Sequence, residues 1–229
     1  MPANSPSTDQ RIDTVVLDMD GTLVDTVYHH VTAWIRAFDG IGAEVPVWRI
    51  HRAIGMGSDR LVPEVAGEDV EKAHGDDVRD AHDEQFEAMI DQVHPLPGAR
   101  DLLAELRRRD VKVVLATSGL PEQTDRLLAV VEGGDKIDRA TTSEDAEETK
   151  PSPELVEVAI EAVRGTHAVV VGDAVWDVKA AKDAGCVAVG LLTGGFGEGE
   201  LRDAGADRVY ATPGDLLADL DAVLAGPTG

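Results

Sequence analysis

Two aspartates, Asp18 and Asp20, follow the apolar run Val15–Leu17 near the start of the chain, and Gly21 comes directly after them. The run is typical of a buried strand, in which side chains at positions i and i+2 point the same way, so both carboxylates can face one small volume. Two anions that close repel each other unless a cation lies between them or one is protonated. The pair suits Mg²⁺, with one carboxylate as nucleophile and the other as general acid/base; the alternative is an acidic strand end that caps a turn.

Polar side chains also follow later strand-like runs. Thr117 has a hydroxyl ahead of a helical pattern, which suits a phosphate oxygen, and Lys150 precedes a proline and could neutralise a phosphoryl group or the nucleophile. Asp173 could complete the ligand set of a cation, with Asp177 supporting it from outside that set. Taken singly, each has an ordinary alternative: a turn threonine, a surface lysine, or carboxylates that cap a helix.

As a set, these residues resemble the haloacid dehalogenase-like (HAD) hydrolase superfamily. The run Asp18–Asp25, Asp-Met-Asp-Gly-Thr-Leu-Val-Asp, is similar to its first signature. The other groups follow in the superfamily's order: a threonine or serine after a strand, a lysine before a proline, and then Gly-Asp-x-x-x-Asp. The resemblance covers residues 14–195.

The resemblance implies a role for each matching position. It implies that Asp18 is a nucleophile that forms an aspartyl-phosphate, and that Asp20 protonates the leaving oxygen and then activates water. It implies that Mg²⁺ is held by the side chains of Asp18 and Asp173 and by the backbone carbonyl of Asp20, while Asp177 orients these ligands. It also implies that the phosphoryl group is held by Thr117, Lys150 and the N–H groups of Met19 and Ser118.

The elements that must position these residues alternate along the chain. Strand patterns occur over residues 14–17, 111–116, 140–142, 168–173, 186–190 and 208–210. Helical patterns occur over residues 26–38, 60–65, 69–93, 99–110, 121–131, 154–163, 174–184 and 216–224. This alternation predicts an α/β fold with a doubly wound, Rossmann-like parallel sheet.

The segment of residues 44–94 contains no convincing strand, so the chain between the first two strands is predicted to be an inserted α-helical cap and not a crossover helix. We expect an α/β core of residues 1–24 and 95–229, with residues 25–94 as the cap over the active site. A cap in this position resembles the subgroup that includes phosphoglycolate phosphatases, β-phosphoglucomutases and haloacid dehalogenases. One turn of the cap is expected to face the core, which makes His51, Arg52 and the loop 55–59 candidates to touch the leaving group. His29 and His30 are expected to be packing or surface residues.

The charge of the chain limits its partners. Its 21 Lys and Arg and 44 Asp and Glu give a net charge of −23, which repels nucleic acid and anionic membranes, and the charged residues are spread along a chain with 43% hydrophobic residues. The pattern resembles halophilic proteins, in which high salt screens self-repulsion. Residues 1–12 are predicted to be a flexible arm without the apolar centre of a signal peptide, and no apolar run spans a membrane, so we expect a cytoplasmic monomer or homodimer. Cys186, the only cysteine, is predicted to be a small buried residue in a strand.

These observations favour a Mg²⁺-dependent hydrolase of small phosphorylated metabolites, similar to phosphoglycolate phosphatase. A phosphomutase of the β-phosphoglucomutase type is the alternative, since it uses the same core. Asp20 and Asp173 argue against a 2-haloacid dehalogenase, which needs neither a metal nor the second aspartate. A non-catalytic binding module is expected to have lost Asp18 or Lys150, and both are present.

Overall fold

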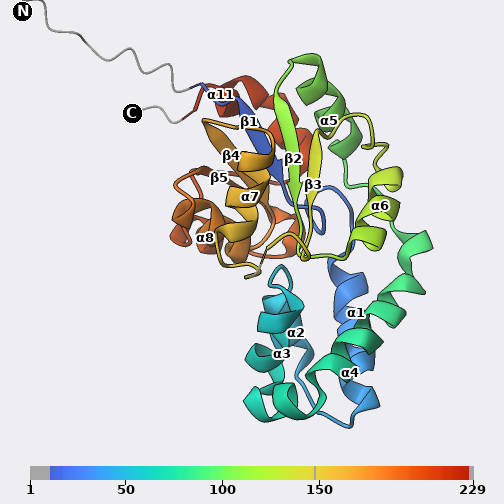
Figure 1. Cartoon of the computed structure of the whole chain (residues 1–229). Coiled ribbons are helices and arrows are strands. Elements are labelled where there is room, and N and C mark those ends of the chain that lie inside the picture. The colour runs from blue at the N-terminus through green and yellow to red at the C-terminus, as the bar shows by residue number, and fades with distance from the viewer. Residues whose placement is uncertain (1–10, 147, 227–229) are drawn as a thin grey trace, which may run out of the picture.

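A parallel sheet lies at the centre of the larger of two lobes in the computed structural model, which describes residues 11–146 and 148–226 (Figure 1). Its strands are β1 (Thr14–Leu17), β2 (Lys112–Ala116), β3 (Arg139–Thr141), β4 (Ala168–Gly172), β5 (Val187–Leu191) and β6 (Arg208–Tyr210). Their order is β3-β2-β1-β4-β5-β6, and all neighbouring pairs are parallel. The chain therefore winds away from β1 in both directions, which places a ligand-binding crevice at the carboxyl ends of the central strands.

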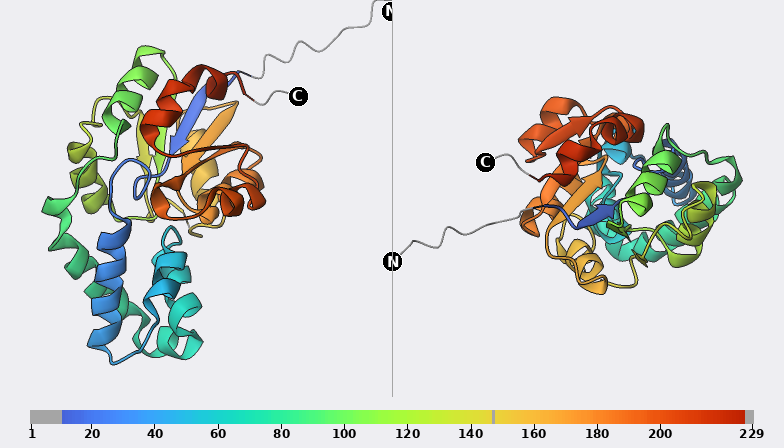
Figure 2. Two further views of the ribbon diagram at one scale, coloured as in Figure 1. Left: turned by 180° about the vertical axis from the view of Figure 1, so that it is seen from behind. Right: turned by 90° about the horizontal axis from the view of Figure 1, so that it is seen from above.

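Helices cover both faces of the sheet, because alternate side chains of its buried strands point to opposite sides (Figure 2). Val15 and Leu17 pack with one group of helices, and Val16 packs with the other. The first group contains α5 (Ala99–Arg108), α6 (Pro121–Val130), α10 (Pro213–Ala218) and α11 (Leu220–Leu224). The second group contains α7 (Glu154–Ala162), α8 (Val175–Asp183) and α9 (Glu198–Asp203). A short 3₁₀ turn, η2 (Leu192–Gly194), follows β5.

The smaller lobe is helical and lies beyond the carboxyl end of β1 (Figure 2). It comprises α1 (Val27–Gly40), α2 (Val47–Ala53), α3 (Ser58–Ala66) and α4 (Glu68–Glu87), followed by the 3₁₀ turn η1 (Ile90–Gln92). It has an apolar core of its own, which includes Val31, Trp34, Phe38, Leu61 and Val78. We call these elements the helical lobe. Its two connections to the sheet lobe run side by side, since the Asp25 N–H donates to His94 O and the Leu96 N–H donates to Leu23 O.

The predicted α/β fold, with a doubly wound parallel sheet and an inserted helical cap, is confirmed. The predicted helix 69–93 is too long. Helix α4 ends at Glu87 and Val93 is extended, because the chain must turn back to the sheet and Pro95 disfavours helical backbone at His94. The predicted helix 216–224 is divided at Asp219, whose carboxylate accepts hydrogen bonds from Tyr210 Oη and Arg208.

Two smaller predictions concern the chain start and the cysteine. Most of the predicted arm, residues 1–10, lies outside the described residues, but Ile12 is buried and its N–H donates to Leu224 O. Cys186 is half-buried and directly precedes β5, so it is not within the strand as predicted. Among the described residues, no helix is both long and apolar enough to cross a membrane.

Candidate active site

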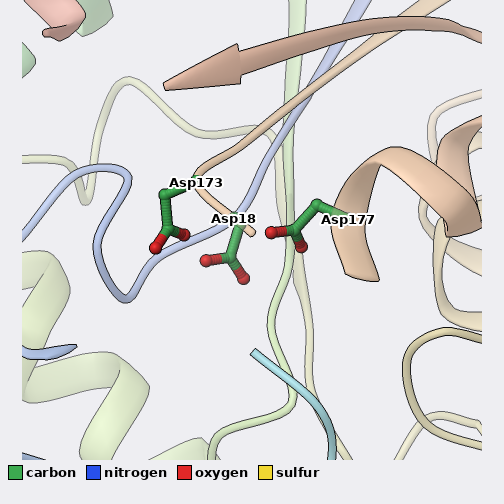
Figure 3. A group of neighbouring side chains, drawn as sticks. All are labelled: Asp18, Asp173 and Asp177. Carbon is green, nitrogen blue, oxygen red and sulfur yellow. The ribbon is translucent and has the colours of Figure 1, made fainter. Parts of the chain in front are cut away.

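Three buried carboxylates meet at the carboxyl ends of β1 and β4 (Figure 3). Asp18 follows β1, Asp173 follows β4, and Asp177 lies in the first turn of α8. Strands β1 and β4 are neighbours, and the Asp18 N–H donates to Val171 O at 3.0 Å, which brings the two strand ends together. One oxygen from each carboxylate lies within 4.8 Å of the others. The sheet thus gathers three acids that are far apart in the sequence.

Lys150 supplies a positive charge to this cluster. Its Nζ atom lies 2.6 Å from Asp18 Oδ1 and 2.7 Å from Asp177 Oδ1, and its side chain is only 2% exposed. The other oxygen of Asp177 accepts a hydrogen bond from the Ala174 N–H at 3.1 Å. Asp177 therefore both caps the start of α8 and holds Lys150.

Burial and the neighbouring charges together shift the pKa values of this cluster. Burial raises the pKa of Asp18 to about 7, although the Lys150 ammonium lowers it. Burial also raises the pKa of Asp173 well above its usual value, and the Asp177 and Asp18 carboxylates add to the rise. Burial lowers the pKa of Lys150, but the same two carboxylates outweigh this effect and raise it overall. Three buried carboxylates beside one ammonium offer hard oxygen ligands and lack positive charge. This donor set fits a divalent cation such as Mg²⁺.

Two glycines make room for the carboxylate of Asp173. A Cβ atom would lie 2.2 Å from Asp173 Oδ2 if placed on Gly21, and 2.1 Å from it if placed on Gly194. Gly21 also has a φ of +76°, a conformation that L side chains rarely adopt. Any larger residue at either position displaces Asp173, so the glycine after Asp20 is required by the site itself.

Asp20 lies beside this cluster and has different partners. Its Oδ1 atom accepts a hydrogen bond from Thr26 Oγ1 at 2.6 Å and lies 3.0 Å from His30 Nε2. Burial raises the pKa of Asp20, but His30 and Thr26 more than offset this, so the pKa is lowered overall. The pKa values of the two aspartates of the motif are thus shifted in opposite directions by different neighbours.

A chain of hydrogen bonds extends from Asp20 into the helical lobe. His30 Nδ1 lies 3.1 Å from His82 Nε2, and His82 Nδ1 lies 3.0 Å from Asp83 Oδ1. The two rings thus link the carboxylates of Asp20 and Asp83. Burial lowers the pKa of His82 below its usual value, although the Asp83 carboxylate acts in the opposite direction.

A cavity between the two lobes reaches the acids. From the sheet lobe it is lined by Asp18, Asp20, Thr117, Ser118, Gly119, Leu120, Gln123 and Ser143. From the helical lobe it is lined by His30, Trp34, Ile54, Gly55, Met56, Ser58, Leu61, His82 and Asp83. The hydroxyl oxygen of Ser118 is buried and has no hydrogen-bond partner among the described residues, which leaves it free for a phosphate oxygen.

A family model described as haloacid dehalogenase-like hydrolase matches residues 12–185. The chain belongs to this family. It is 30% identical to a phosphoglycolate phosphatase of Pseudomonas putida over 223 residues, which cover 93% of this chain and 78% of that protein. A solved hydrolase from Pseudomonas syringae has 36% identity and a TM-score of 0.87, and the match covers 92% of this chain and 98% of the other. The predicted HAD resemblance and the prediction of a phosphatase of the HAD type are confirmed.

More distant structures share the fold of this HAD-like hydrolase. A β-phosphoglucomutase from Clostridium difficile has a TM-score of 0.80 at 18% identity, with coverage of 93% of this chain and 97% of that one. Since phosphatases and mutases share this architecture, the fold alone does not distinguish the two reactions.

Not every predicted site residue lies at the cavity. Arg52 is directed outward: its guanidinium pairs with Glu200 at 2.5 Å and lies 4.0 Å from the centre of the Phe196 ring. His51 contacts the sheet lobe, with its Nε2 atom 3.0 Å from Gly194 O. The side chain of Met19 is fully buried in the core, so only its backbone is available to a substrate.

Sequence reasoning missed His30 and His82 of this HAD-like hydrolase. The two rings come from α1 and α4, where His30 stacks on Phe86 and His82 stacks on Trp34, each at 4.0 Å between ring centres. One signal was present in the sequence: Thr26 and His30 are four residues apart, on one face of the helix that follows the Asp-x-Asp motif. Both side chains contact Asp20.

Proposed function

We propose that this protein is a Mg²⁺-dependent hydrolase of small-molecule phosphomonoesters that works through an aspartyl-phosphate on Asp18. The observation that carries the proposal is the placement of Asp18 beside Lys150 and the two further acids, with Asp20 a separate, differently tuned carboxylate at the same cavity. The phosphoglycolate phosphatases at 29–30% identity support the same reaction class.

In the first step, a carboxylate oxygen of Asp18 forms a bond to phosphorus as the bond from phosphorus to the leaving oxygen breaks. Asp20, which is ionised in the free protein and must be protonated in the substrate complex, gives that proton to the leaving oxygen, which departs as an alcohol. In the second step Asp20 takes a proton from water, whose oxygen attacks phosphorus and releases inorganic phosphate and free Asp18. Lys150, Thr117 and Ser118, with the backbone N–H groups of Met19 and Ser118, hold the equatorial oxygens, where negative charge develops.

The side chains of Asp18 and Asp173 and the backbone carbonyl of Asp20 would hold Mg²⁺, and Asp177 would orient this set through Lys150. When bound, the ion supplies charge neutralisation at the phosphoryl oxygens. We divide the chain into a core of residues 1–24 and 95–229 and a cap of residues 25–94, which contains the helical lobe. In this proposal the cap encloses the leaving group and limits the access of water during the first step.

The test is phosphate release in molar KCl with Mg²⁺, with para-nitrophenyl phosphate and a panel of phosphorylated metabolites as substrates. Wild type should release phosphate, EDTA should stop it, and Asp18→Asn should abolish it, while Asp39→Asn, at an exposed carboxylate of α1, should not. Asp20→Asn should accumulate protein carrying one added phosphoryl group on Asp18. Folded, Mg²⁺-loaded wild type that releases no phosphate would contradict the proposal, and interconversion of sugar phosphates without release would indicate a mutase instead.

A further inference from the structure

The part of the cavity that faces the helical lobe is where a leaving group must lie. Trp34, Ile54, Met56 and Leu61 give it an apolar wall. Ser58, Gln123 and Asp83 give it hydroxyl, amide and carboxylate groups. Such a surface suits a small leaving group with apolar carbons and a few hydroxyl groups.

None of the described residues that line this cavity is a lysine or an arginine. Every Lys and Arg of residues 25–94 is engaged elsewhere in the structure. Arg36 donates to Gln85, Arg49 to Glu64 O, Arg52 to Glu200 and Arg79 to Glu71, while Arg60 pairs with Asp59 and Glu148, and Lys72 with Glu68. Residues 25–94, which include the helical lobe, therefore offer no free cation to a negatively charged leaving group.

The sheet lobe also offers no free cation to the leaving group. Lys150 is not among the residues that line the cavity, and it is paired with Asp18 and Asp177, so its charge acts at the phosphoryl end. The two histidines that line the cavity are paired with carboxylates, His30 with Asp20 and His82 with Asp83. The wall that faces the leaving group therefore has a net negative charge.

We propose that the leaving group is an uncharged, hydroxyl-bearing alcohol, and that the site selects against substrates with a carboxylate or a second phosphate on the leaving side. This inference rests on the proposed function and narrows it. A second anion enclosed beside Asp83 loses its water and gains no counter-ion, whereas a hydroxyl can donate a hydrogen bond to the same carboxylate. The inference sets this chain apart from its phosphoglycolate phosphatase relatives, since phosphoglycolate carries a carboxylate.

Matched substrate pairs test the inference. Glycerol 3-phosphate and 3-phosphoglycerate share a three-carbon skeleton and differ in a CH₂OH against a carboxylate, and 2-hydroxyethyl phosphate and 2-phosphoglycolate form the equivalent two-carbon pair. We expect kcat/KM to be about tenfold or more higher for the uncharged member of each pair. Equal or higher values for the carboxylates would overturn the inference.

A variant of Asp83 tests whether the preference for an uncharged leaving group comes from this wall. Asp83→Asn should lower the preference for the uncharged member by several-fold, because it removes the negative charge that the helical lobe contributes to the wall. Asp80→Asn, which removes the same charge from an exposed position of α4, should leave the preference unchanged. An unaltered preference in Asp83→Asn would overturn the assignment of selectivity to this wall.

Hydrolysis of para-nitrophenyl phosphate distinguishes a failure of the proposed function from a failure of the leaving-group inference. If wild type hydrolyses it and Asp18→Asn does not, the proposed function holds, and the matched pairs alone decide the leaving group. If wild type hydrolyses neither this compound nor any member of the pairs, the proposed function fails and the inference fails with it.

Discussion

The Nζ atom of Lys150 lies 2.6 Å from Oδ1 of Asp18, although the two residues are 132 positions apart in the sequence. Both side chains are buried, and the ammonium also contacts Asp177. Lys150 thus balances part of the negative charge of the acid cluster and holds the proposed nucleophile in one orientation.

Replacing Lys150 with methionine should damage both activity and stability. The variant keeps the side chain's approximate length but leaves buried carboxylates without a counter-charge, so we expect kcat to fall by roughly 100-fold or more. The free energy of unfolding of the metal-free protein should fall by about 3 kcal/mol, because one partner of a buried pair is removed. Urea denaturation and phosphate release measure the two effects. Lys182→Met, which breaks the more exposed pair with Asp207, should alter both by far less.

The pKa of Asp18 predicts how the stability of the metal-free protein depends on pH. Its value is raised from 3.8 to about 7, so its contribution to stability is fully present below pH 3.8 and is lost as the pH rises to about 7. Asn at this position resembles the protonated acid, so Asp18→Asn should gain stability relative to wild type between pH 5 and pH 8. The gain should be at most a few kcal/mol, since one pKa unit corresponds to about 1.4 kcal/mol. Urea denaturation in EDTA at several pH values measures it, and a difference that shrinks as the pH rises would contradict the assignment.

The same protonation should govern the binding of Mg²⁺. Below pH 7 the ion has to displace a proton from Asp18, and the raised pKa of Asp173 adds to this requirement. The affinity should therefore fall as the pH decreases from 8 to 6, by up to roughly tenfold per pH unit for each proton displaced. Calorimetric titration in buffers with different ionisation enthalpies measures both the affinity and the protons released. Binding that is independent of pH over this range would rule out protonation of the ligands.

Arg52 tests a sequence-based expectation against the structure. The sequence makes it a candidate contact to the leaving group, whereas the structure places its guanidinium against Glu200 and Phe196, outside the cavity. Arg52→Ala should therefore change kcat/KM by less than about threefold, as expected for an exposed ion pair. A KM increased by tenfold or more, with kcat unchanged, would instead show that Arg52 binds substrate.

The parts of this protein that could be predicted from sequence depend on local patterns. Short β-branched runs identified the strands, and because parallel strands end at one edge of a sheet, Asp18 and Asp173 could be expected to meet there. Lys150 lies in the loop between β3 and α7, and only the HAD resemblance implied that it joins them. The contact between His30 and His82 spans 52 positions and depends on how α1 packs on α4, which neither helix's own pattern encodes. The direction of Arg52 likewise depends on where Glu200 of α9 lies, so sequence spacing could not assign it.

His30 should act on catalysis by positioning Asp20. Its Nε2 atom lies 3.0 Å from the Asp20 carboxylate, so His30→Ala leaves that carboxylate held by Thr26 alone among the hydrogen-bond partners described here. We expect kcat to fall by roughly 10- to 100-fold, within the range that general acid/base catalysis contributes, while KM changes little. His29→Ala, at the adjacent position and outside the cavity lining, is the matched control and should retain activity. In an Asp20→Asn background the further change His30→Ala should cost little, since the two residues act as one unit, and additive losses would contradict this coupling.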